Sequence, residues 1–262
     1  MQSGYWQDRT TADFRRVDPE TTVALLPVAA VEQHGPHLPL STDAVINEGL
    51  VRAALPLVPA HVTLLVLPAL TVGLSPEHTS FAGTLTIKDT TLAHVWTDVG
   101  RSVARAGVRK LVILNTHGGQ KALVDLVAMR LRAELDMLVA RATYFAFGSP
   151  RGLFDAAESA HDIHGGEVET SLMLHLAPGL VRETELADFK GLPHDLAARN
   201  RVLGAEKPVG IGWRAEDLHP SGACGNAARG DAAKGAKHLA HLADRLATLV
   251  AELAATPLAT LK

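Results

Sequence analysis

Short apolar runs rich in β-branched residues alternate along this chain with longer segments whose apolar residues recur at helical spacing. The short runs predict strands at residues 22–29, 62–72, 110–115 and 137–145. The longer segments predict helices at residues 43–55, 89–106, 120–134, 167–176 and 231–253. Because strands and helices alternate, we expect an α/β fold with a mainly parallel sheet and helices on both faces.

Residues 177–230 interrupt this alternation. They are rich in Gly and Pro and predict loops together with a small hairpin. The sequence shows no linker composition and no internal repeat. We therefore expect residues 1–262 to form a single α/β domain, which this length allows.

Charge and apolar content narrow the class of protein. The formal net charge is −3 and no basic cluster with interleaved aromatic residues occurs, so we expect no nucleic-acid partner. The polar, charged segment 1–16 is not typical of a signal peptide, and the apolar runs are too short to span a membrane. A single cysteine, Cys224, cannot form an internal disulfide. These features predict a cytoplasmic protein that has no membrane partner.

Residues 32–43 hold two histidines and two carboxylates within twelve residues. They read Glu-Gln-His-Gly-Pro-His-Leu-Pro-Leu-Ser-Thr-Asp and follow the first predicted strand. Glu32 and His34 point the same way on an extended segment, so both could reach one pair of metal ions. Asp43 lies at a predicted helix start, where its carboxylate could bridge two metals or could simply cap the helix.

Two later segments repeat the combination of His or Glu beside glycines. Asn-Thr-His-Gly-Gly places His117 after the third predicted strand, as a ligand or as the polar end of a strand before a turn. His-Gly-Gly-Glu-Val-Glu places His164, Glu167 and Glu169 at a helix start, where either carboxylate could bind metal or only complement the helix dipole. In open α/β sheets, ligands bind beyond the carboxyl ends of the strands, so the three segments could converge on one site.

Oxygen and nitrogen ligands without thiolates are typical of a hydrolytic metal centre, and this mixed set permits Zn, Mn or Fe. His164 suits proton transfer beside such a centre. His78, after the second predicted strand, could line the pocket or orient a ligand, and His37 and Glu77 are weaker candidates. Phosphate-binding glycine loops and the G-x-S-x-G nucleophile elbow do not occur in the sequence.

Together the three motifs resemble the creatininase (creatinine amidohydrolase) family over residues 20–250. The resemblance implies a three-layer α/β/α fold, two divalent metal ions per chain and a homo-oligomer, commonly a hexamer. It implies that Glu32, Asp43 and His117 hold one ion. It also implies that His34, Asp43 and Glu169 hold the second ion, with Glu167 as the alternative to Glu169.

The sequence departs from true creatinine hydrolases at two points. Those enzymes carry a carboxylate two residues after the third-strand His, where this chain has Gly119, and they place tryptophans between the second and third motifs, where residues 118–163 hold none. We therefore predict weak or absent activity on creatinine.

The predicted function is that of a dinuclear amidohydrolase that cleaves the C–N bond of a small cyclic amide or formamide rather than a peptide bond. His164, Glu167 and His78 are its catalytic candidates. Two alternatives remain open: a metallopeptidase that trims a cofactor-precursor peptide, and a metal-binding scaffold without activity.

Overall fold

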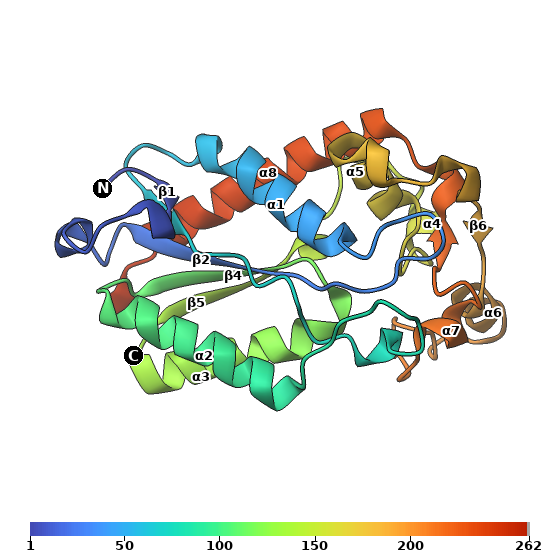
Figure 1. The fold of residues 1–262 in the computed structure, drawn as a ribbon, viewed down its shortest axis with the longest axis horizontal. Coiled ribbons are helices and arrows are strands. Elements are labelled where there is room, and N and C mark those ends of the chain that lie inside the picture. The colour runs from blue at the N-terminus through green and yellow to red at the C-terminus, as the bar shows by residue number, and fades with distance from the viewer. Residues whose placement is uncertain (261–262) are drawn as a thin grey trace.

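A five-stranded parallel sheet forms the centre of the protein in this computed structural model, which describes residues 1–260. The strand order is β1-β3-β2-β4-β5 (Figure 1). The strands are β1 (Gly4–Tyr5), β2 (Thr22–Val28), β3 (Thr63–Val66), β4 (Lys110–Asn115) and β5 (Leu138–Thr143). The predicted domain runs to residue 262, and its last two residues lie outside the described part of the chain.

The middle of the sheet is buried on both faces. Every residue of β2 and β4 is buried, and the two strands pair in parallel from Val23 opposite Lys110 to Val28 opposite Asn115. Continuous apolar runs of this kind suit strands that helices cover on both sides. Since side chains alternate along a strand, Val23 and Leu25 enter one core while Ala24 and Leu26 enter the other.

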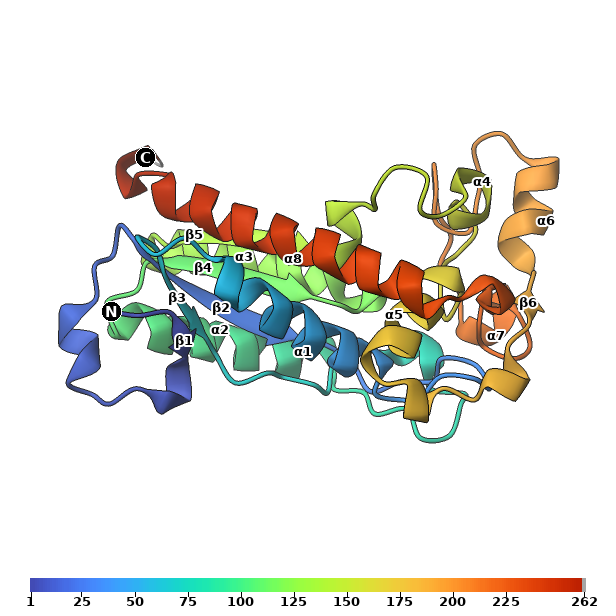
Figure 2. The same cartoon turned by 90° about the horizontal axis from the view of Figure 1, so that it is seen from above.

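Helices form a layer on each face of the sheet, as Figures 1 and 2 show. One face is covered by α1 (Thr42–Ala54), α5 (Glu167–Leu176) and α8 (Ala232–Ala255), and the other by α2 (Asp89–Arg105) and α3 (Lys121–Leu135). The predicted three-layer α/β architecture is therefore confirmed. None of the helices described within residues 1–260 is long and apolar enough to cross a membrane.

Two predicted strands are longer than the observed ones, and one short strand was missed. The strand predicted at 62–72 ends at Val66, and Leu70 adds only an isolated bridge to Val28, because Pro68 lacks the N–H that a ladder needs. The strand predicted at 137–145 ends at Thr143, where a 3₁₀ turn begins. The two-residue edge strand β1 was not predicted, since so short a segment carries no periodic signal.

The irregular segment after α5 contains more structure than the sequence indicated. Its strands β6 (Asp188–Phe189) and β7 (Gly225–Asn226) pair antiparallel, but they are not the two arms of a hairpin. The chain between them forms α6 (Leu192–Arg199) and α7 (Ala215–Leu218), and α4 (Ala156–Ser159) precedes α5. In both ribbon views these elements lie at the end of the molecule opposite the two termini (Figures 1 and 2).

Candidate metal centre

The five predicted ligands converge at the carboxyl ends of the sheet strands. Glu32 and His34 follow β2, His117 follows β4, and Asp43 and Glu169 lie in the first turns of α1 and α5. All five side chains are buried. Carboxylates and imidazoles are almost never buried without partners, so this cluster needs an explanation beyond packing.

His117 lies against two of the predicted carboxylate ligands. His117 Nδ1 lies 3.0 Å from Glu32 Oε1 and 3.5 Å from Asp43 Oδ2. The other ring nitrogen, Nε2, donates a hydrogen bond to the carbonyl oxygen of Leu74 at 2.9 Å. This bond leaves the lone pair on Nδ1, directed at the two carboxylates. His117 can therefore share a metal ion with a neighbouring carboxylate.

A second group shares Asp43 with the first. His34 Nε2 lies 3.3 Å from Asp43 Oδ1 and 3.9 Å from Glu169 Oε2. The Nδ1 atom of His34 donates to the carbonyl oxygen of Glu32 at 3.0 Å, so Nε2 carries the lone pair. Because each oxygen of Asp43 faces a different imidazole, its carboxylate can bridge two ions.

Unpaired polar atoms in the cluster fit this assignment. Glu32 Oε2, His34 Nε2 and Asp43 Oδ2 are fully buried and have no hydrogen-bond partner among the described residues. Such atoms cost free energy unless a ligand satisfies them. Divalent cations bound at the two groups would satisfy these atoms and would offset the repulsion among the carboxylates, so the donor set fits the metals that the sequence implies.

Burial and the neighbouring charges shift the pKa values of these groups. Burial, together with the nearby Glu32 carboxylate, raises the pKa of Asp43 to about 6. Burial opposes the charged form of His34, but Asp43 outweighs it and raises the pKa of this imidazole to about 9. In the absence of a cation, protons thus compensate the clustered carboxylates, which is the role that bound metal would take over.

Two further histidines stack against the cluster. The His164 ring lies 4.1 Å from that of His34 and 4.4 Å from that of His78, between ring centroids. Its Nε2 atom donates to the carbonyl oxygen of Gln33 at 2.5 Å, and its Nδ1 atom lies 4.0 Å from Glu32 Oε1. Burial lowers the pKa of His164 to about 4, so the ring is neutral near pH 7 with a free lone pair toward the cluster.

His78 is held by its neighbours in one orientation. The Gln33 side-chain amide donates to its Nδ1 atom at 2.7 Å, and its Nε2 atom lies 3.4 Å from Glu32 Oε1. Burial, followed by the neighbouring His164, lowers the pKa of His78 to about 2. The ring therefore stays neutral and can donate to Glu32, which suits a residue that orients a ligand.

The two carboxylates at the start of α5 have different surroundings. Glu169 Oε2 accepts from the backbone N–H of Gly165 at 2.7 Å, and Glu169 Oε1 accepts from Tyr144 Oη at 3.3 Å. Glu167 instead pairs with Lys234 and lies 3.4 Å from Arg229 Nε. The predicted catalytic candidate Glu167 is thus placed in a group of ion pairs outside both ligand sets.

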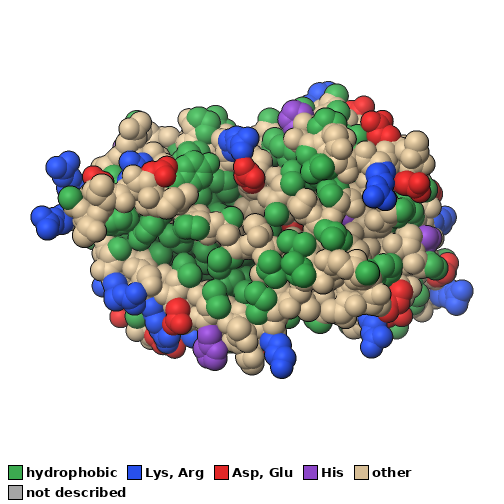
Figure 3. All heavy atoms as spheres, in the orientation of Figure 1, with side chains coloured by type: hydrophobic (Ala, Val, Ile, Leu, Met, Phe, Trp, Pro, Cys, Tyr) green, Lys and Arg blue, Asp and Glu red, His purple; other side chains and the backbone are tan. Residues whose placement is uncertain are grey.

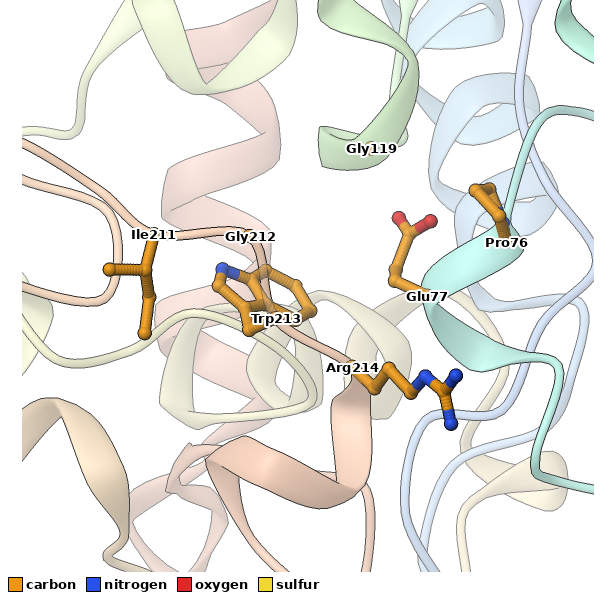
Figure 4. Close-up of a pocket in the computed structure, with 7 residues that line it drawn as sticks. All are labelled: Pro76, Glu77, Gly119, Ile211, Gly212, Trp213 and Arg214. Atoms are coloured by element: carbon orange, nitrogen blue, oxygen red, sulfur yellow. The ribbon is translucent and has the colours of Figure 1, made fainter.

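A cavity of about 410 Å³ opens beside the cluster (Figure 4). Glu77 and Gly119 lie on one side of it and Trp213 on the other. The Trp213 ring also meets His78 edge to face, at 6.4 Å between centroids. Sequence reasoning missed this residue because Trp213 comes from the irregular segment and lies far from any motif.

His37 belongs to the support of the site rather than to either ligand set. Its Nε2 atom donates to the carbonyl oxygen of Gly165 at 2.8 Å, and the ring stacks on Phe189 at 5.1 Å between centroids. These contacts tie the first motif to the loop that precedes α5. His37 therefore fixes the relative position of two segments that carry predicted ligands.

The chain is similar to several known proteins. The profile of the protein family Creatininase, described as creatinine amidohydrolase, matches residues 7–250. The chain is 32% identical to the mycofactocin precursor peptide peptidase of Mycobacterium ulcerans, over 71% of this chain and 72% of that protein. It is 33% identical to the creatinine amidohydrolase of Pseudomonas putida, over 66% of this chain and 71% of that protein.

Solved structures extend the likeness over the whole fold. A crystal structure from Bacteroides fragilis, assigned as a creatinine amidohydrolase, superposes with a TM-score of 0.77 at 28% identity and covers 98% of both chains.

Proposed function

Because this chain belongs to the creatininase family, we propose that it hydrolyses an amide C–N bond with two divalent metal ions per chain. The observation that carries the proposal is the position of Asp43, whose two oxygens face His34 at 3.3 Å and His117 at 3.5 Å. A carboxylate shared in this way is what a two-metal hydrolytic site requires.

In this proposal, some side chains bind the metal ions and another transfers a proton. Glu32, Asp43 and His117 would hold one ion, and His34, Asp43 and Glu169 the other. The ions would supply Lewis-acid activation of the amide carbonyl and of water. His164 is neutral and directs a free Nδ1 atom at the cluster, so it can take up a proton there and deliver it to the leaving nitrogen.

Two substrate classes follow from the comparisons and the site. A peptide is favoured by the relative named as a mycofactocin precursor peptide peptidase and by a cavity at the surface, whose lining includes the exposed Ile211 and Arg214. A small cyclic amide or formamide is favoured by the likeness to creatinine amidohydrolase. Creatinine itself is the poorer candidate, because Gly119 offers no carboxylate beside His117.

One assay separates these classes and tests the function itself. Protein stripped of metal and reloaded with Zn or Mn is given cyclic amides, formamides, creatinine and short peptides. We expect metal-dependent cleavage of at least one substrate, and its loss in Asp43→Asn, while the exposed control Glu48→Gln keeps full activity. Tightly bound metal without cleavage of any substrate would favour the scaffold alternative.

We also propose that the protein is a cytoplasmic homo-oligomer. The lone buried cysteine, Cys224, fits a reducing compartment. In Figure 3, apolar side chains gather in the middle of one face while most charged side chains lie near its edge, which suits contact with another copy of the chain. Light scattering on the purified protein tests this, because a monomer at micromolar concentration would contradict it.

A further inference from the structure

Gly119 is the residue of the second motif that has no room for a side chain. A Cβ atom built on it would overlap Glu77 Oε1 and would lie 2.7 Å from His117 Nε2. The neighbouring Gly118 differs, because a Cβ atom there would meet nothing within 4 Å. The backbone of Gly119 does not have a positive φ angle, so conformation does not demand glycine at this position.

The group that fills this space is the carboxylate of Glu77, from the loop after β3. Figure 4 shows this side chain pointing toward Gly119. Glu77 Oε1 lies 3.4 Å from His117 Nε2 and 3.9 Å from His78 Nε2, and the side chain is only 12% exposed. Glu77 also forms a possible ligand group with Glu32 and His117, whose donor atoms all lie within 4.8 Å of one another.

The contact falls on the side of His117 that faces away from the proposed ion. Its Nδ1 atom faces Glu32, whereas its Nε2–H is donated to the Leu74 carbonyl oxygen, and Glu77 Oε1 lies 3.4 Å from the same Nε2 atom. A carboxylate against the outer N–H of a ligating imidazole fixes the tautomer and the ring orientation and increases the basicity of the ligand atom.

We propose that Glu77 is a positioning residue that occupies the side-chain space of residue 119 and holds His117 ready for metal. The inference rests on the metal centre of the proposed function. The proposal explains why the second motif has glycine at position 119, where a side chain would collide with Glu77. It also explains why the buried carboxylate of Glu77 reaches the site from a different loop.

Metal affinity tests the positioning role without any substrate. We expect Glu77→Ala to bind two ions per chain at saturation but to weaken the affinity of one of them ~10–100-fold, as measured by chelator competition. Glu77→Gln keeps an acceptor oxygen and should lose less than Glu77→Ala. The visible spectrum of the Co²⁺-loaded protein should change in Glu77→Ala, because the His117 ligand would reorient.

The steric part of the proposal is tested at the glycines. Gly119→Ala should weaken metal binding at least as much as Glu77→Ala, whereas the matched control Gly118→Ala should leave it unchanged. The double variant Glu77→Ala/Gly119→Ala should bind metal no more weakly than Gly119→Ala alone, because both changes remove the same contact. Glu48→Gln, an exposed carboxylate on α1, controls for the loss of one negative charge.

Three results would overturn the inference: unchanged metal affinity and Co²⁺ spectrum in Glu77→Ala, additive losses in the double variant, or equal losses in Gly118→Ala and Gly119→Ala. A wild-type protein that binds no metal would instead overturn the proposed function. The two failures are therefore distinguishable in the same experiment.

Discussion

His34 presents its Nε2 atom to Asp43 Oδ1 at 3.3 Å, and both residues are buried. The second oxygen of Asp43 has no hydrogen-bond partner among the described residues and faces His117. Asp43 is the second residue of α1 and follows the N-cap Ser41, so its carboxylate does not occupy the capping position. The position of Asp43 is therefore better explained by a pair of ions than by helix capping.

The first prediction concerns this shared carboxylate. Asp43→Asn keeps the size of the side chain but removes its charge, so it should lose both ions rather than one. Elemental analysis should find two ions per chain in the wild type and fewer than one in the variant. Loss of a single ion would show that Asp43 does not bridge.

The second prediction separates the carboxylates at the start of α5. Glu169→Gln should lose one ion, because Glu169 faces His34 at 3.9 Å. Glu167→Gln should keep both ions but should lower the free energy of unfolding by about 1–2 kcal/mol, since it breaks partly exposed pairs with Lys234 and Arg229.

Metal analysis and urea denaturation of the two variants check this pair of outcomes. Lys234→Met serves as the matched control for the ion-pair group, because it disrupts the same pairs without touching a predicted ligand. It should reproduce the stability loss of Glu167→Gln and keep both ions. If Glu167→Gln loses an ion while Glu169→Gln does not, the ligand role passes to Glu167.

The sequence predicts those parts of the site that depend on local motifs, and not those that depend on contacts between distant residues. Glu32, His34 and His117 were predicted as ligands because each lies in a local motif at the end of an apolar run, and parallel strands end at one edge of the sheet. The choice between Glu167 and Glu169 was beyond the sequence, because both lie in the same helical turn. Only packing shows which of them faces the cluster.

Contacts between residues far apart in the sequence could not be predicted either, because they also depend on packing. The collision between Glu77 and a side chain at position 119 depends on how the loop after β3 meets the loop after β4. Trp213 reaches the cavity from a segment whose strands pair across two intervening helices. The alternation of strands and helices, in contrast, is set by local periodicity, and the sheet and its two helical layers were predicted from it.

The third prediction concerns pH in the metal-free protein. The pKa of His34 is raised to about 9, because Asp43 outweighs burial, and the pKa of His117 is also raised, by Glu32 against burial. A histidine in the unfolded chain has a pKa of about 6.5. Between these pKa values, both imidazoles hold a proton in the folded state that they have lost in the unfolded chain. The stability that they add is therefore complete below about pH 6.5 and is lost as pH rises toward 9.

Thermal denaturation with a chelator at pH 6.5, 7.5 and 8.5 measures this effect. The melting temperature of the metal-free protein should fall across the series. The metal-loaded protein should resist the fall, because ions replace the protons on these imidazoles and bind more tightly as pH rises. A metal-free melting temperature that is flat or rises over this range would contradict the assignment of His34 and His117.

The last prediction concerns His164, which is neutral and stacks on both His34 and His78. If it transfers the proton to the leaving nitrogen, His164→Asn should keep both ions and the fold but reduce turnover ~10²–10⁴-fold. Since its pKa is lowered to about 4, chiefly by burial, the ring accepts a proton only when the reaction supplies one. The variant should also lose one limb of the pH–rate profile.

Metal analysis and steady-state kinetics on one preparation decide between the possible roles of this residue. Its Nδ1 atom lies 4.0 Å from Glu32 Oε1, close enough for a ligand after a small shift, so loss of an ion in His164→Asn would make it a ligand. If turnover is unchanged in this variant, His164 has only a structural role. His78 would then become the next proton-transfer candidate, because its Nε2 atom lies 3.4 Å from the same carboxylate oxygen.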